Sequence, residues 1–322
     1  MPRLAPEDAR ERVSRTLAAW GAPPDVAECV AGHLVEADML GHPSHGVRQL
    51  LRYRGLIDSG EWVVGASPSV VRSEGGLATI DGAGGMGHPA LALAVDEAAA
   101  LARRFGVGAC GVVRCGHAGR MGAWAERGAA LGMATLIVLA GGEPPFAMAA
   151  GPGAEAALHT NPVTLGVPAD GTPFVLDMAT SAVAGGKVVV AAARGDRLAP
   201  GILLDRHGEP TEDPDEFAAG GSLLPAAGYK GFGLSAMIEA LSIGMVGADG
   251  DGLRPRSGAL VICIAGDAFR PADEARASVE GLRARLHDSG SERTVVLAPG
   301  ELEASRRGGD GIDIDDDVMA IL

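Results

Sequence analysis

The chain is poor in aromatic residues: Phe, Trp and Tyr make up only 3% of its 322 residues. A core with so few rings has to be built from Ala, Val, Leu and Met, whose small side chains let helices and strands pack closely. Glycine is abundant instead, with 49 residues, which indicates many tight turns or backbone that approaches a ligand. Hydrophobic residues make up 47% and charged residues 21%, as in a globular protein of one large domain or two interlocked ones.

Positive charge is also scarce, because 27 Lys and Arg stand against 41 Asp and Glu, for a net charge of −14. Such an acidic surface repels phosphate backbones and argues against nucleic acid as a partner. No run of about 20 apolar residues occurs, so we expect no membrane span. Residues 1–17 are charged and lack the apolar centre of a secretion signal, so we expect a cytoplasmic protein.

Four cysteines, Cys29, Cys110, Cys115 and Cys263, contain no CxxC pair. This spacing favours reduced, mostly buried thiols over a disulfide framework or a zinc site. The acidic segment 308–317 lacks the spacing of a calcium loop and is expected to be a solvated end. We therefore expect no metal.

Periodicity predicts an α/β chain with mixed sheets. The segment 195–229, rich in Gly, Pro and Asp, is expected to be a loop. The expected helices cover 6–19, 25–39, 46–57, 88–104, 119–131, about 179–193, 230–246 and 271–287, and the expected strands cover 108–114, 133–140, 174–178, 259–266 and 294–299.

Gly82, Gly84 and Gly87 match the GxGxxG pattern of dinucleotide-binding Rossmann folds, between a strand-like segment and a helix. That fingerprint requires an acidic residue at the end of the next strand, where this chain has Arg114. The motif also follows some 80 residues of unrelated helix, and a chance match is easy in a glycine-rich chain. We therefore favour a plain glycine-rich turn over a Rossmann site.

Segment 41–48 combines two histidines, a serine and an arginine before a predicted helix. We expect Ser44 to cap that helix and its positive end to lower the pKa of His45. An imidazole can donate a proton to a carbonyl, and the Arg48 guanidinium can bind a carboxylate through two bonds. The pair therefore suggests a site for a 2-keto acid. The alternatives are a capped helix with surface charges, or a metal site through His42 and His45, which lacks further clustered ligands.

Four other segments place polar groups at turns. Residues 114–122 join a strand to a helix through small residues, which exposes backbone N–H groups to a phosphate. Residues 159–162 form a polar turn before a proline, and 177–181 lead into a helix that carries Lys187. Lys230, flanked by glycines, is suited to a phosphate or a carboxylate.

Six blocks together resemble the malate/L-lactate dehydrogenase family of the non-Rossmann type, in the family's order and over nearly the whole chain. This family includes type 2 malate/lactate, ureidoglycolate, sulfolactate and diketogulonate dehydrogenases and the reductases of cyclic imine carboxylates, such as piperideine-2-carboxylate. The blocks are EADMLGHPSHGVRQLLRYR, VRCGHAGRMGAWAE, HTNPVTLGVP, FVLDMATSAVAGGKV, LLPAAGYKGFGLSAMIE and LAPGELEASRR.

The resemblance implies an α/β, non-Rossmann, mixed-sheet fold that binds NAD or NADP, with an N-terminal helical segment. It also implies a homodimer with sites close to the subunit interface. Residues 1–75 would join the C-terminal part in a substrate and dimerisation domain. Residues 76–230 would bind NAD(P), and 231–322 would return to the first domain.

Site roles follow from the same resemblance. His45 would donate the proton to the carbonyl, with Ser44 beside it in a relay and Lys187 in the catalytic set. Arg48 and Thr160 would bind the substrate carboxylate. His117 would contact the substrate and is a rival for the acid/base role. The cofactor would be held by His117, Ala118, Gly119, Arg120, Met121, Asp177, Met178, Ala179, Lys230, Gly300 and Arg306.

The chain departs from the family pattern at 115–119, where the family commonly has a polar pair before His-Phe-Gly, and at His159, where it usually has glycine. Lys187 stands where the imine reductases carry aspartate, which favours a 2-hydroxy acid. The sequence therefore predicts hydride transfer between NAD(P)H and C2 of a small 2-keto or 2-hydroxy acid. The alternatives are a cyclic-imine carboxylate reductase and a ligand-binding protein on a retired enzyme scaffold. Arg114 and Arg120 are candidate partners for the 2′-phosphate of NADP.

Overall fold

The computed structural model describes residues 2–250, 252, 254–291 and 293–322. A seven-stranded sheet forms its centre, in the order β2-β3-β4-β13-β5-β8-β9. β3 and β4 pair in parallel and the other neighbours are antiparallel, so the predicted mixed sheet is confirmed. The strands are β2 Ser69–Glu74, β3 Leu77–Asp81, β4 Val107–Val113, β5 Met133–Gly141, β8 Val163–Val167, β9 Phe174–Met178 and β13 Ser257–Ala265.

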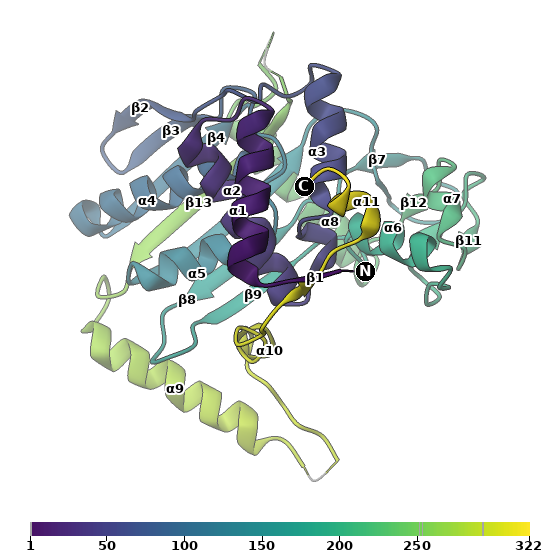
Figure 1. The fold of residues 1–322 in the computed structure, drawn as a ribbon. Helices are drawn as coiled ribbons and strands as arrows, with labels where there is room; N and C mark the ends of the chain where they lie inside the picture. The colour runs from purple at the N-terminus through teal and green to yellow at the C-terminus, as the bar shows by residue number, and fades with distance from the viewer. Residues whose placement is uncertain (1, 251, 253, 292) are drawn as a thin grey trace.

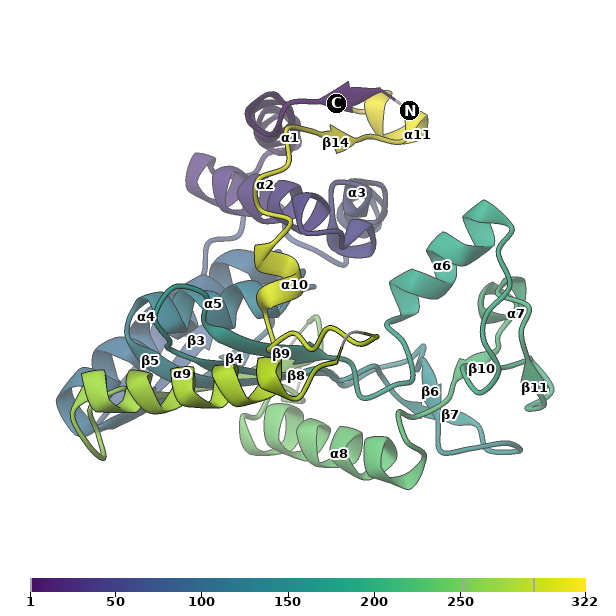
Figure 2. The same cartoon turned by 90° about the horizontal axis from the view of Figure 1, so that it is seen from below.

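Helices cover both faces of this sheet (Figure 2). α4 (Gly87–Phe105) and α5 (Gly122–Ala130) lie on one face, and α8 (Tyr229–Glu239) with the π-helical turn Ala240–Met245 lies on the other. The core between α4 and the sheet is built of small side chains such as Ala94, Ala98 and Val112, all fully buried. A Cβ on Gly108 would lie 2.2 Å from the Ala98 carbonyl oxygen, so this core packs closely, as its shortage of rings predicts.

The N-terminal helices form a layer above α4 and α5 (Figure 2). They are α1 (Pro6–Ala19), α2 (Pro24–Met39), the 3-10 turn η1 (Pro43–His45) and α3 (Gln49–Asp58). The C-terminal end returns to this layer and brings the two termini close together (Figure 1). There β14 (Ile312–Asp313) pairs with β1 (Arg3–Leu4), and α11 (Asp316–Met319) follows.

The expectation that 308–317 is a solvated end was therefore wrong. Ile312, Ile314 and Val318 are buried among the side chains of α1 and α2. Ile312 and Ile314 alternate with Asp313 and Asp315, so the apolar side of the segment packs on the helices while the carboxylates lie on the other side.

The segment 195–229 is also more ordered than predicted. It contributes β10 (Leu203–Leu204), β11 (Pro210–Thr211) and β12 (Ser222–Leu223) to a second, five-stranded sheet, and it also contains the short helix α7 (Asp215–Ala218). β6 (Met148–Ala149) and β7 (Ala156–Leu158) complete that sheet, and α6 (Gly185–Arg194) packs beside it (Figure 1). Strands of two residues give too short an alternation to be recognised in a sequence.

The predicted strand 294–299 was wrong. The segment is an extended connection between α9 (Ala272–Asp288) and α10 (Glu301–Ala304), and Val295 is 85% exposed. The carbonyl of Pro299 accepts a hydrogen bond from the Val175 N–H of the edge strand β9, at 3.2 Å. Because proline has no N–H to donate in return, the pairing stops there.

The glycine-rich turn 82–87 interlocks with the loop after β4. Gly82 N–H donates to Val113, Gly84 N–H to Arg114 and Gly87 N–H to His117, while the N–H of the facing Gly116 donates to Gly85. A Cβ on Gly87 would lie 2.2 Å from the Gly116 carbonyl oxygen. The glycines therefore serve a close contact between two loops, and this contact holds the segment that carries His117.

All four cysteines are free thiols, and Cys110, Cys115 and Cys263 are buried, as predicted. No helix in the described ranges has the length and apolar character needed to cross a membrane.

Candidate active site

His45 lies at the end of η1, and α3 begins only at Gln49, later than the predicted residue 46. Ser44 does not cap that helix, which corrects the prediction. Its hydroxyl instead lies 3.0 Å from His45 Nδ1. The cause is Asp38, whose carboxylate accepts the Val47 N–H at 2.7 Å and leaves no room for a Cβ on Gly46. A carboxylate from α2 thus fixes the turn, and Ser44 is free to orient the imidazole.

His117 stacks against His45, with ring centroids 5.7 Å apart and planes inclined by 23°. The hydroxyl of Tyr53 lies 2.7 Å from His117 Nδ1. Both rings are thus oriented through Nδ1, which leaves Nε2 as the atom for a ligand. Tyr53 was not among the predicted site residues, although the sequence has only two tyrosines and this one lies on the inward face of a helix, which was a usable signal.

Both imidazoles are held neutral. Burial lowers the pKa of His45 to about 4, and the charges of His42, Lys187, Arg120 and Arg52 add to this effect. Burial also lowers the pKa of His117 well below its usual value, followed by the charge of Arg52. Burial raises the pKa of Tyr53 above its usual value, so the phenol stays protonated and remains a donor.

Lys187 lies in the first turn of α6, which approaches η1 closely. A Cβ on Gly186 would lie 2.9 Å from the Cβ of Ser44. The ammonium group is exposed, and its charge contributes to the low pKa values of His45 and His42. The structure therefore brings Lys187 close to His45, from a point 142 residues further along the chain.

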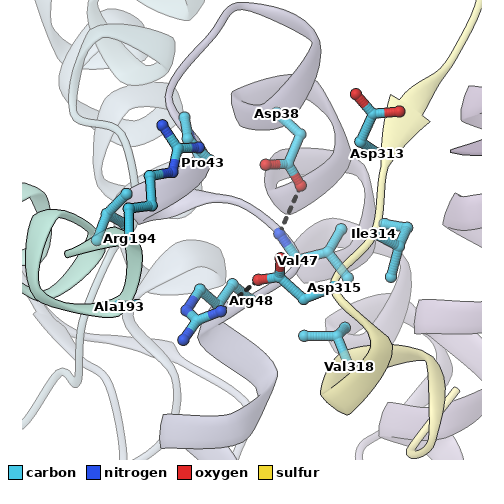
Figure 3. Close-up of a pocket in the computed structure, with 11 residues that line it drawn as sticks. Asp38, Pro43, Val47, Arg48, Ala193, Arg194, Asp313, Ile314, Asp315 and Val318 are labelled. Atoms are coloured by element: carbon cyan, nitrogen blue, oxygen red, sulfur yellow. Dashed lines mark hydrogen bonds and ion pairs between the residues drawn. The ribbon is translucent and has the colours of Figure 1, made fainter. Parts of the chain in front are cut away.

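Arg48 turns toward the C-terminal segment, where its guanidinium pairs with the Asp315 carboxylate (Figure 3). It lines a cavity of about 270 Å³ that also contains Asp38 and Arg194. Arg52, one helical turn later, is exposed, and its charge lowers the pKa of both His45 and His117. Arg52 was not among the predicted site residues, although its spacing of four residues from Arg48 in a predicted helix was visible.

Four segments predicted to bind the cofactor or the substrate are joined to one another. Asp177 accepts the Gly122 N–H at 2.7 Å, which ties β9 to the loop 117–121. Thr180 Oγ1 donates to the Thr160 carbonyl at 3.0 Å, and the Ala226 N–H donates to the Thr180 carbonyl at 2.9 Å. Met178 and Ala179 lie between these bonds. Lys230 is exposed in the first turn of α8, which follows directly.

The loop 117–121 is itself tightly packed. Ala118, Gly119 and Met121 are buried. The Arg120 side chain is only 4% exposed, and its guanidinium binds the Glu126 carboxylate at 2.8 Å. The charge of Arg120 is therefore neutralised within the protein.

The C-terminal residues reach the far side of the 41–43 turn. Arg306 donates to the Leu40 carbonyl at 3.1 Å, and His42 Nε2 lies 3.4 Å from Glu303 Oε1 without an aligned hydrogen bond. Gly300 takes a positive φ of 93° and packs on β9. These contacts place α10 over the turn that carries the histidines.

The chemistry of this region fits NAD(P). Small residues line the meeting segments, and two exposed lysines, Lys187 and Lys230, can balance phosphates. Three buried polar atoms, Gln49 Oε1, Asn161 Oδ1 and His42 Nε2, have no hydrogen-bond partner among the described residues, as expected where a polar ligand completes a site. Within residues 2–250, 252, 254–291 and 293–322, no three His, Cys, Asp or Glu residues cluster in a way that could hold a metal ion.

The family model described as malate/L-lactate dehydrogenase matches residues 4–322. The chain is 33% identical to the L-sulfolactate dehydrogenase of Methanothermobacter thermautotrophicus over 98% of its own length and 94% of that protein. It is 35% identical to the (2R)-3-sulfolactate dehydrogenase (NADP(+)) of Chromohalobacter salexigens, over 88% and 85%. The crystal structure of the Δ1-piperideine-2-carboxylate reductase of Pseudomonas syringae superimposes with a TM-score of 0.86 at 30% identity, covering 99% of this chain and 98% of that one.

Proposed function

The chain belongs to the malate/L-lactate dehydrogenase family, and on that basis we propose that it is an NAD(P)-dependent oxidoreductase of small 2-hydroxy and 2-keto acids. The observation that carries the proposal is the pair of stacked, neutral imidazoles, His45 and His117. Each is oriented through Nδ1, by Ser44 and Tyr53 respectively. NAD(P)H, when bound, supplies the hydride for C2.

His45 is the proposed acid and base, with Ser44 beside it in a relay. Neutral at pH 7, it is in the state that accepts the hydroxyl proton when a 2-hydroxy acid is oxidised. In the reverse direction, the negative charge of a bound carboxylate stabilises the imidazolium and raises its pKa. This prepares His45 to donate a proton to the carbonyl oxygen. His117 is proposed to hydrogen-bond the same substrate.

We propose that Arg52 provides the main positive charge for the substrate carboxylate. Its charge acts on both imidazoles, whereas the guanidinium of Arg48 is engaged by Asp315. Arg48 and Thr160 remain predicted members of the substrate site, since Arg48 would have to leave Asp315 in order to bind a carboxylate. Lys187, beside Ser44, is proposed to keep His45 neutral until the substrate arrives.

Reduction of a cyclic imine carboxylate is a second candidate function, favoured by the similarity to the Pseudomonas syringae reductase. Such a substrate carries the same carboxylate next to the reduced carbon, so the same arginine would bind it. The two candidates differ in the source of the proton. A carbonyl oxygen needs a proton from His45, whereas an iminium nitrogen already carries one.

A substrate panel tests the proposal. Purified protein is mixed with NADH or NADPH and with pyruvate, oxaloacetate, 3-sulfopyruvate or Δ1-piperideine-2-carboxylate, and the loss of absorbance at 340 nm is followed. We expect turnover of at least one 2-keto acid. Turnover of the imine alone would favour the second candidate. Cofactor binding without turnover of any compound would point to a retired enzyme scaffold.

We also propose a homodimer in the cytoplasm. The outward side of α8 and the following turn exposes Leu234, Met237 and Met245, an apolar strip that suits a second copy of the chain. The four free thiols fit a reducing compartment. Light scattering after gel filtration should give twice the mass of the chain, and Met237→Glu should shift it toward the monomer. A monomeric wild-type protein would contradict the proposal.

A further inference from the structure

Two more histidines lie behind the stacked pair. His33 comes from α2 and His88 from the first turn of α4, and their ring centroids are 4.8 Å apart. His33 also stacks on Trp124 of α5, at 4.9 Å with planes inclined by 20°. Both imidazoles are buried. Neither belongs to the proposed catalytic set, so their presence in the core calls for another explanation.

His33 and Trp124 both bind the backbone of the loop 117–121. His33 Nε2 accepts the Arg120 N–H at 2.8 Å, and Trp124 Nε1 donates to the Ala118 carbonyl at 3.0 Å. Between these two bonds, a Cβ on Gly119 would lie 2.2 Å from His33 Nε2 and 2.8 Å from His88 Nε2. The loop is thus held at three consecutive residues, directly after His117.

The contact at Arg120 depends on an unprotonated Nε2. Burial lowers the pKa of His33 well below its usual value, so the ring is neutral and carries its proton on Nδ1. An apolar side chain of similar size would fill the same space but would leave the Arg120 N–H buried without an acceptor. Packing alone therefore does not account for a histidine at this position.

We propose that His33 is a positioning residue that holds the loop 117–121, and with it His117, in the geometry that the reaction uses. The inference rests on the proposed function only for the role of that loop in binding cofactor and substrate. His33 itself touches neither, and it acts through the backbone of Arg120.

Two polar variants separate this role from simple packing. The Oε1 of His33→Gln reaches the place of Nε2 and can accept the Arg120 N–H, whereas His33→Asn is polar but too short. We expect the Gln variant to keep the dissociation constant of NADH within about threefold of wild type and the Asn variant to weaken it about tenfold, the usual effect of one lost hydrogen bond. Val26→Ala, a buried change on the same helix in the core that α2 shares with α1, controls for general loosening of α2.

Hydrogen exchange of the peptide that covers 117–124 gives a readout independent of catalysis. Exchange should be fast in the Asn variant and as slow as wild type in the Gln variant. Equal exchange and equal NADH affinity in both variants would overturn the role of His33. Wild-type protein that fails to bind NADH or NADPH, with the exchange difference intact, would sink the proposed function and leave the loop contact standing.

If neither variant folds, the wild-type protein still decides the question. Nitrogen NMR of selectively labelled histidine reports which ring nitrogen carries the proton. We expect His33 to be the Nδ1–H form with an unprotonated Nε2 at pH 7.5, and a proton on Nε2 would rule out the contact with Arg120.

Discussion

The two histidine pairs of this protein share a residue type and a neighbourhood but differ in what holds them. In the front pair, Ser44 and Tyr53 bind Nδ1 of His45 and His117 and leave Nε2 to a ligand. In the rear pair, His33 gives its Nε2 to the backbone of Arg120, and neither ring nitrogen of His88 has a hydrogen-bond partner among the described residues. The partner of each ring nitrogen, rather than burial, therefore distinguishes the imidazoles proposed to react from the one proposed to support them.

Among the histidines of the two pairs, His45 is expected to cause the largest loss of kcat when it is removed. Loss of a general acid and base typically lowers the rate about 10²- to 10⁴-fold, so kcat of His45→Ala should fall by that order while the dissociation constant of NADH stays near wild type. Steady-state kinetics and NADH fluorescence titration measure the two quantities. His207→Ala, at an exposed histidine in the turn between β10 and β11, is the matched control. Near-normal kcat in His45→Ala would transfer the role to His117.

The next largest difference is expected between Arg48, directly before α3, and Arg52 in its first turn. Loss of a charge-assisted bond to a carboxylate costs about 1.5–3 kcal/mol, so Arg52→Ala should raise KM for the 2-keto acid about 10- to 100-fold. Arg48→Ala should change KM less and lower the melting temperature instead, because it leaves Asp315 without its partner. The opposite ranking of KM values would show that Arg48 leaves Asp315 to bind the substrate.

Tyr53→Phe removes the hydroxyl that orients His117 and keeps the ring. Since one neutral hydrogen bond is lost, kcat/KM should fall about threefold to tenfold with little change in melting temperature. Unchanged kcat/KM would mean that packing alone orients His117.

The last expected difference concerns His88 and the pH dependence of stability, and it does not involve activity. Burial lowers its pKa to about 3, whereas the unfolded chain has a value of about 6.5. The unfolded state therefore binds more protons below pH 6.5, and the contribution of His88 to stability is lost as pH falls from about 6.5 toward 3. The free energy of unfolding of His88→Leu, relative to that of wild type, should therefore rise by about 1.4 kcal/mol when the pH falls from 7.5 to 5.5.

Urea unfolding at the two pH values checks this prediction. Subtracting the free energies of unfolding of the two proteins cancels the contribution of the titratable groups that they share. One of these is Asp38, because burial raises its pKa to about 7. A difference that stays constant with pH would show that His88 titrates normally in the folded protein.

Prediction from sequence succeeded where the pattern was long. Helices such as α1, α2 and α4 and the strand β9 appeared within a residue or two of their predicted bounds. It failed for strands of two residues, and for 294–299, where an apolar run met Pro299 at the sheet edge.

For the site, the sequence singled out the front histidines because both lie in polar, glycine-flanked turns. His33 lies inside the predicted helix 25–39 and was not singled out, since its partner is 87 residues away. Arg52 and Tyr53 were missed because nothing in a single helix shows which side chains face a loop that follows much later. Such contacts depend on packing between elements, and one sequence carries no direct signal for them.

The most direct test of the account is a crystal structure with NADH and oxamate, an unreactive analogue of a 2-keto acid. The account predicts the nicotinamide ring beside His45, the oxamate carbonyl within hydrogen-bond distance of His45 Nε2, and its carboxylate on the guanidinium of Arg52. Nicotinamide on the glycines of 82–87, or oxamate bound away from both histidines of the front pair, would contradict it.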